Sequence, residues 1–70
     1  MKLNYSELNS EYLNWSAENG DGRNKQDLRF GQYLWSKYNN MSNFTDVFYI
    51  ESCERVYSIL LNDLYKLEIK

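Results

Sequence analysis

The sequence predicts an all-α protein, a small three-helix bundle with an aromatic-rich connector before the last helix. Three segments carry apolar residues at three- and four-residue spacing, which places them on one face of a helix. No two stretches alternate in a way that would let them pair as strands. Seventy residues joined by short connections make one small domain, residues 1–70.

The last helix, residues 52–67, has the most regular pattern and is the element on which we expect the others to pack. Its apolar face repeats over four turns without interruption, whereas Ile59 lies opposite that face and is expected to be exposed. The residues of the face are Cys53, Val56, Tyr57, Leu60, Leu61 and Leu64.

The first helix is predicted to begin after Asn4, which is a favourable N-cap with Glu7 three residues further on. Asn19-Gly20 supplies a left-handed stop at its end. Between these limits one stripe of apolar and aromatic residues faces the core, namely Tyr5, Leu8, Tyr12 and Trp15.

The second helix is predicted over residues 24–38, with Asn24 at its start and Asp27 in its first turn. Gly31 lies in its middle, where glycine costs about 1 kcal/mol relative to alanine. We therefore expect another helix or a ligand backbone to approach closely there. Phe30 and Tyr33 lie off the main face, so at least one of them is expected to be partly exposed.

Residues 41–51 form the aromatic-rich connector, and the pattern leaves open whether they are extended or contain a helical turn. In either case we expect Phe44 and Phe48 to lie across the core. The composition supports a core rich in rings, since the chain has two Trp, seven Tyr and three Phe. Such rings help a short chain, which buries only about 60% of its unfolded surface.

The residue inventory argues against an enzyme and against a bound metal or cofactor. The single cysteine and the lack of histidine rule out an internal disulfide and a Cys/His zinc site. The tract around Gly22 echoes a calcium-binding loop, but Ala17 and Leu28 stand where its first and twelfth ligands are needed. Cys53 lies on the apolar face, so it is interpreted as a buried structural thiol.

No apolar run is long enough to cross a membrane, and the N-terminal residues do not have a signal-peptide pattern. We therefore expect a cytoplasmic protein with no membrane partner. Charge is unevenly spread, because residues 23–37 carry a net charge of +3 within a chain whose net charge is −2. This basic segment is small for a nucleic-acid-binding domain, so we do not expect nucleic acid to be the main partner.

A short motif gives one resemblance. Arg29-Phe30-Gly31-Gln32, followed by Tyr33-Leu34, resembles a pattern in small uncharacterised proteins of phages and bacteria, R-(aromatic or aliphatic)-G-Q-x-L/F. A later F-Y-x-acidic segment in that group is matched by residues 48–51, and the resemblance spans residues 23–52. The chain has Trp35-Ser36 where the group often has Asn. The resemblance implies a small helical protein of phage or prophage type and draws attention to Arg29, Gly31 and Gln32.

These observations predict a non-enzymatic module that binds another protein, in concrete form a phage or prophage modulator of a host protein. The expected contact residues are Arg29, Phe30, Gln32, Tyr33 and Tyr49, because Tyr, Trp and Arg are frequent interface anchors.

Two alternatives remain. A nucleic-acid-binding regulator would use the 24–38 helix, with Lys25, Arg29, Gln32 and Ser36 lining one side. A structural homodimer would close a shared core of rings.

Overall fold

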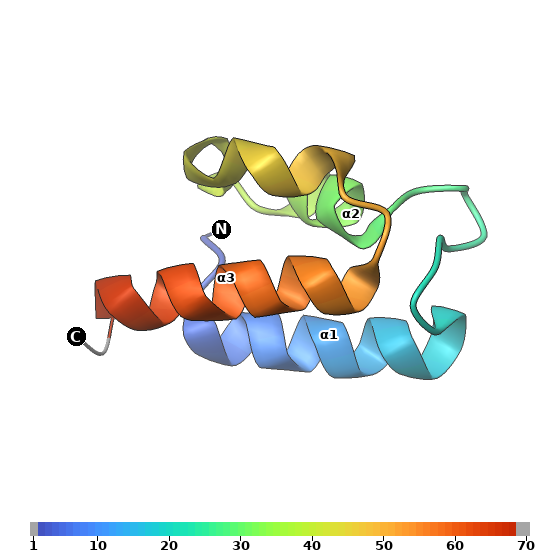
Figure 1. Cartoon of the computed structure of the whole chain (residues 1–70), viewed down its shortest axis with the longest axis horizontal. Coiled ribbons are helices and arrows are strands. Elements are labelled where there is room, and N and C mark those ends of the chain that lie inside the picture. Colours follow the sequence, from blue (N-terminus) through green and yellow to red (C-terminus); the bar gives the residue numbers. More distant parts are fainter. Residues whose placement is uncertain (1, 69–70) are drawn as a thin grey trace.

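The computed structural model describes residues 2–68 as two layers of helices (Figure 1). One layer holds α1 (Tyr5–Asn19) and α3 (Cys53–Glu68), which run antiparallel side by side. The other holds α2 (Phe30–Lys37) and a 3₁₀ helix, η1 (Met41–Tyr49). The all-helical prediction is confirmed, but the described residues form four helical segments where three were expected.

Local signals set both ends of α1 as predicted. The Asn4 Oδ1 accepts a hydrogen bond from the Glu7 N–H at 2.7 Å, which satisfies one of the free amides of the first turn. At the other end Gly20 has a φ of 67°, a left-handed value that glycine adopts without strain. Its N–H donates to the Ser16 carbonyl and closes the helix.

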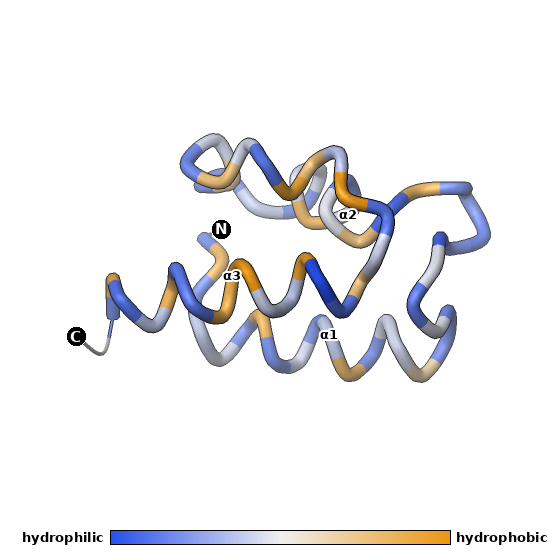
Figure 2. Tube along the Cα trace, in the orientation of Figure 1, coloured by the Kyte–Doolittle hydropathy of each residue, from blue (hydrophilic) through white to orange (hydrophobic). Residues whose placement is uncertain are grey.

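Helix α2 is shorter than predicted, because it begins at Phe30 and not at Asn24. Asn24 does cap a turn: its Oδ1 accepts from the N–H groups of Gln26 and Leu28, each at 3.0 Å. Asp27 then takes a φ of 62°, which is incompatible with a continuing right-handed helix. The whole connection from α1 is therefore an irregular loop, mostly hydrophilic in Figure 2.

The aromatic-rich connector is helical, with a kink at Phe44. This answers the question that the sequence left open for residues 41–51. The expected close approach at Gly31 is confirmed, and the neighbour is the backbone of η1. A Cβ on Gly31 would lie 2.1 Å from the Val47 carbonyl oxygen, far inside any contact distance. Glycine is thus what lets α2 and η1 pack as one layer.

The loop after α1 also caps α3. The Asp21 carboxylate accepts from the Glu54 N–H at 2.7 Å and from the Ser52 hydroxyl, while the Asp21 carbonyl accepts from the Cys53 N–H. These contacts satisfy the free amides at the start of α3 and place a negative charge at the positive end of its dipole. The start of α3 is therefore fixed jointly by Asp21 of the α1–α2 loop and by Ser52, whose hydroxyl accepts from the Arg55 N–H at 3.2 Å.

The core lies between the two layers and draws on every element. Its buried side chains include Leu8 and Trp15 of α1, Phe30 and Leu34 of α2, Phe44 and Val47 of η1, and Cys53, Val56, Leu60 and Leu64 of α3. Ile59 is half-buried against this core, so the expectation that it is simply exposed is wrong. The thiol of Cys53 is buried, as predicted.

Candidate functional site

Four of the five expected contact residues, all except Tyr49, make their contacts within the protein. Phe30 has no exposed surface and packs on the Trp15 ring at 5.3 Å, so it cannot serve as a surface anchor. Phe30 is the first residue of α2. Because the helix begins there and not at Asn24, its buried face contains Phe30, Gly31 and Leu34. Gln32 uses its Oε1 to accept from the Arg29 N–H at 2.9 Å, which makes it a cap of α2.

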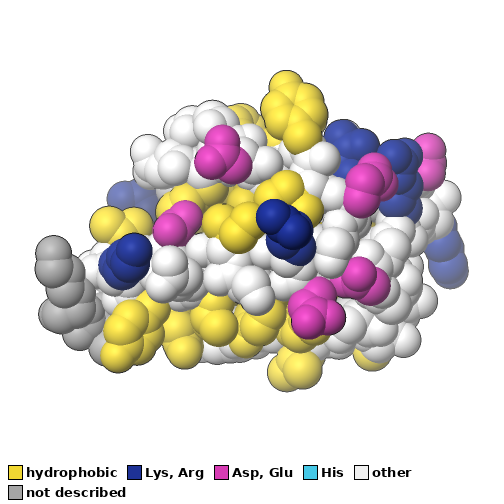
Figure 3. Space-filling model, viewed as in Figure 1, with side chains coloured by type: hydrophobic (Ala, Val, Ile, Leu, Met, Phe, Trp, Pro, Cys, Tyr) yellow, Lys and Arg dark blue, Asp and Glu magenta, His cyan; other side chains and the backbone are white. Residues whose placement is uncertain are grey.

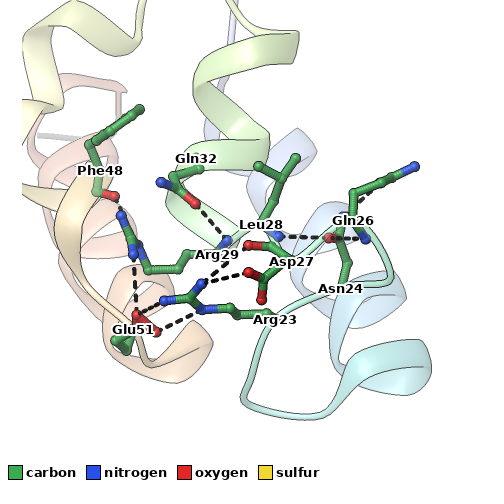
Figure 4. A network of polar contacts seen from close by, with 9 residues as sticks. All are labelled: Arg23, Asn24, Gln26, Asp27, Leu28, Arg29, Gln32, Phe48 and Glu51. Atoms are coloured by element: carbon green, nitrogen blue, oxygen red, sulfur yellow. Dashed lines mark hydrogen bonds and ion pairs between the residues drawn. The ribbon is translucent and has the colours of Figure 1, made fainter.

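Arg29 belongs to a polar clamp that also contains Arg23 and Glu51 (Figure 4). Arg23 holds the Glu51 carboxylate with two nitrogens, at 3.1 and 2.7 Å, and Arg29 reaches the same carboxylate at 3.2 Å. Arg29 Nε also donates to the Phe48 carbonyl at 3.3 Å. The hydrogen bond from Arg23, then that from Arg29, holds the pKa of Glu51 below its usual value despite an opposing desolvation effect.

The clamp has a positioning role, because it joins the α1–α2 loop, the start of α2 and the end of η1. Only 17% of the Arg29 side chain is exposed, so little of its guanidinium is open to a partner. The ion pairs of Arg23 and Glu51 lie nearer the surface and are screened by water. The clamp therefore fixes the backbone of Phe48 and its neighbour Tyr49.

The basic face expected for nucleic acid is not formed as a helical stripe. Lys25 lies in the loop before α2, four residues ahead of the cap, and its side chain is exposed. Arg29 and Gln32 are held by the contacts described above, and the Ser36 hydroxyl donates to the Tyr33 carbonyl at 2.7 Å. The predicted stripe is wrong because Asp27 has a left-handed backbone, which separates Lys25 from the helix.

Tyr33 lies at a buried carboxylate that the sequence did not reveal. Glu11 of α1 is 7% exposed and accepts hydrogen bonds from the hydroxyls of Tyr33 and Tyr38, while its carboxylate pairs with Lys37 at 2.7 Å. Burial raises the pKa of Glu11, but the bonds from Lys37, Tyr38 and Tyr33 together outweigh it and the pKa lies below its usual value. The same contacts raise the pKa of Lys37.

This Glu11 cluster borders a shallow cleft of about 890 Å³ between α1, the following loop and α2. The lining mixes acidic, basic and amide side chains, among them Glu18, Lys25 and Gln26. Each donor around Glu11 already has its acceptor within the protein. The cluster thus joins the two layers. It was not predicted from the sequence, because Glu11 is a charged residue on the same face of α1 as the apolar Leu8 and Trp15, about one turn from each.

A ring cluster of Trp35, Phe48 and Tyr49 lies on the layer of α2 and η1. The ring centroids of Trp35 and Phe48 are 5.6 Å apart, those of Phe48 and Tyr49 are 5.1 Å apart, and both contacts are edge-to-face. Tyr49 is 76% exposed, whereas the other two rings are half-buried. The Trp35 indole nitrogen is shielded from solvent and has no acceptor among the described residues.

A second exposed surface, the tyrosine face, covers α1 and α3 on the other layer. Hydrophobic side chains gather there along the lower part of Figure 3. The face consists of half-buried and exposed side chains, namely Tyr5, Tyr12, Leu13, Tyr57, Leu61 and Tyr65.

Comparisons with family models, with curated proteins and with solved structures gave no match. Among residues 2–68, no group of three or more His, Cys, Asp or Glu side chains could hold a metal ion. In the same part of the chain, no helix combines the length and the apolar character that crossing a bilayer requires. The candidate site therefore rests on surface geometry, and the ring cluster and the tyrosine face are two exposed aromatic surfaces among the described residues.

Proposed function

We propose that the protein is a small non-enzymatic module that binds another protein through the ring cluster of Trp35, Phe48 and Tyr49. The observation that carries the proposal is the 76% exposure of Tyr49 on a chain of rings in edge-to-face contact. A large ring left in water at a fixed position is what an interface anchor needs.

The support beneath the cluster favours binding, because it reduces the entropy lost when a partner docks. Arg29 holds the Phe48 carbonyl, and Gly31 lets η1 lie directly on α2. The rings are therefore held by backbone that cannot shift freely, and a pre-organised surface keeps more of its contact energy on binding. Arg29 supports the ring cluster through the Phe48 carbonyl and is not itself a contact residue. Phe30, Gln32 and Tyr33 are not part of the ring cluster.

The Trp35 indole nitrogen indicates which polar group the expected partner should present. A buried N–H without an acceptor costs about 1–3 kcal/mol, and a carbonyl that reached it after a small rotation of the indole would recover that cost. We infer a partner segment that presents an apolar side chain to Tyr49 and a backbone carbonyl beside it. The resemblance of residues 23–52 to phage and bacterial proteins makes a bacterial host protein, in a reducing cytoplasm, the concrete form of this proposal.

The test uses Tyr49→Ala with Leu67→Ala as the matched control. Leu67 is 72% exposed, comparable to Tyr49, but lies on α3 outside both the ring cluster and the tyrosine face. Immobilised wild type, each variant and a blank support are incubated with bacterial lysate, and the captured proteins are quantified. We expect a protein that wild type and Leu67→Ala retain equally and that Tyr49→Ala loses by at least about tenfold.

Circular dichroism of both variants checks that neither substitution changes the fold. The proposal fails if every protein retained by wild type is retained in the same amount by Tyr49→Ala. It also fails if the Leu67→Ala control loses the same proteins, since the ring cluster would then have no special role.

A further inference from the structure

We propose that the cleft between α1, the following loop and α2 binds a neutral saccharide of one or two rings. Its volume of about 890 Å³ is within the range of small-molecule sites, which is about 300–1,000 Å³. None of the three residues of the ring cluster lines the cleft. The saccharide site is therefore separate from the proposed protein-binding surface, and neither depends on the other.

The polar lining of the cleft favours a ligand rich in hydroxyl groups. Many small-molecule pockets are lined mainly by apolar side chains, whereas this lining is mostly polar. It includes amide side chains from α1 and from the loop, namely Asn14, Asn19, Asn24 and Gln26. An amide offers both donors and an acceptor, and so does a hydroxyl, so amides and sugar hydroxyls can pair in either direction.

The charges of the lining argue against an ionic ligand. Among the described residues the lining holds two carboxylates and two ammonium groups, whose formal charges cancel, namely Glu11, Glu18, Lys25 and Lys37. Glu11 and Lys37 pair with each other at 2.7 Å. Glu18 and Lys25 are exposed, so water and salt screen the charge that they could offer to an ion. A phosphate or a zwitterion would therefore gain little here, whereas a neutral ligand meets no net charge.

Aromatic rings in the lining suit the C–H face of a sugar ring. Trp15 and Tyr33 both line the cleft, and their ring centroids are 5.2 Å apart. Trp15 is nearly buried, so the half-buried Tyr33 offers most of the ring surface. The face of an aromatic ring carries partial negative charge, which attracts the weakly positive C–H groups of a pyranose. Ring and amides together match the apolar face and the hydroxyl edge of a sugar.

The loop side of the cleft is held in place before a ligand arrives. The Trp15 indole N–H donates to the Gly22 carbonyl at 3.1 Å, which ties the loop to α1. The Asn24 Nδ2 donates to the Gln26 Oε1 at 3.1 Å, while the Asn24 Oδ1 accepts from two backbone N–H groups. The Gln26 Oε1 is thus engaged, and its Nε2 is the end of the amide left to donate to a ligand. Polar groups that are already fixed lose less entropy on binding.

The first test is heteronuclear NMR on the isotope-labelled full chain, titrated to about 50 mM with glucose, N-acetylglucosamine, maltose and cellobiose. The two indole N–H signals give an internal comparison, because Trp15 lines the cleft and Trp35 does not. We expect at least one of these sugars to shift the Trp15 signal saturably, with a Kd of the order of 1 mM because the cleft is shallow, and to leave the Trp35 signal in place. If none of the four does so, or if both indole signals shift together, the proposal is overturned.

Three other compounds separate a neutral sugar from other ligands. Sorbitol has the hydroxyl groups of a sugar without its ring, while inorganic phosphate and glycine supply an anion and a zwitterion. At equal concentration we expect each of them to shift the Trp15 signal far less than the bound sugar does. A shift from any of the three that equals or exceeds that of the sugar would overturn the proposal.

Salt and a methyl glycoside define the ligand further. Sugar affinity should change less than about twofold between about 20 and 500 mM NaCl, because no ion pair with the ligand is involved. A steep fall with salt would show an ionic contact and refute the neutral site. A methyl glycoside that binds as well as the free sugar would support the end of a glycan as the natural ligand, and a much weaker one would support the free sugar.

Matched substitutions locate the contact. Asn14 and Asn62 are both exposed asparagines on helices, but only Asn14 lines the cleft. Loss of one hydrogen bond should make Asn14→Ala bind the sugar about fivefold more weakly, while Asn62→Ala should change the affinity less than twofold. Circular dichroism checks that both variants keep the fold. Equal effects of the two substitutions would overturn the assignment of the cleft.

Discussion

Replacing Gly31 by alanine sets two calculable effects against each other, so the sign of the stability change tests the packing of α2 on η1. Alanine is the better helix former by about 1 kcal/mol, and in an open site the substitution would stabilise α2 by that amount. In this structure the added Cβ would lie 2.1 Å from the Val47 oxygen and 2.9 Å from its carbonyl carbon. Both neighbours are backbone atoms, so no side-chain rotation can relieve the clash.

The layer must therefore open by more than 1 Å to restore an ordinary contact of about 3.4 Å. Phe30, Leu34 and Val47 are fully buried at this junction and would lose contacts. Overpacking of this kind costs about 1–3 kcal/mol and more where the backbone must move. We expect a net loss of about 3 kcal/mol, a large part of the roughly 4–10 kcal/mol available to a domain of this size.

The assay is urea and thermal unfolding followed by circular dichroism, with Gly22→Ala as the control. Gly22 has open space at its Cβ position and no left-handed φ, so alanine there should leave stability unchanged or raise it by about 0.4–1 kcal/mol. A loss of 3 kcal/mol corresponds to a fall in Tm of at least about 12 °C. If Gly31→Ala is as stable as wild type or more stable, α2 and η1 do not pack as described.

Two further predictions concern buried polar groups. Glu11→Gln should lower the free energy of unfolding by about 2 kcal/mol at pH 7, whereas the exposed Glu18→Gln should change it little. Because the pKa of Glu11 is lowered in the folded state, the stability it adds is present above the ordinary value near 4.3 and is lost as the pH falls below it. A Glu11→Gln deficit measured by urea unfolding that stays constant down to pH 2.5 would contradict this. Cys53 should react with a thiol reagent at pH 8 about a thousandfold more slowly in the folded protein than in urea, since burial raises its pKa to about 12. Equal labelling rates, read by mass spectrometry, would show an open core.

Much of the fold could be predicted because the deciding interactions are local. Asn4 caps an amide three residues away, and Gly20 ends α1 through its own backbone conformation. The apolar spacing of α3 likewise needs no knowledge of the rest of the chain. Even the unfavourable Gly31 was informative, since a cost of about 1 kcal/mol implied a close neighbour.

The errors arise where a local signal has two outcomes or where a partner lies far along the chain. Asn24 has the same capping chemistry at the start of a long helix and in a single turn, and only the left-handed φ of Asp27 decides between them. Because the helix was predicted to begin at Asn24, Phe30 was placed off the buried face and Lys25 was placed on a helix, and both placements are wrong. The contacts of Glu11 with Tyr33 and Tyr38, and the capping of α3 by Asp21, join residues between 22 and 33 positions apart, and no sequence periodicity predicts them.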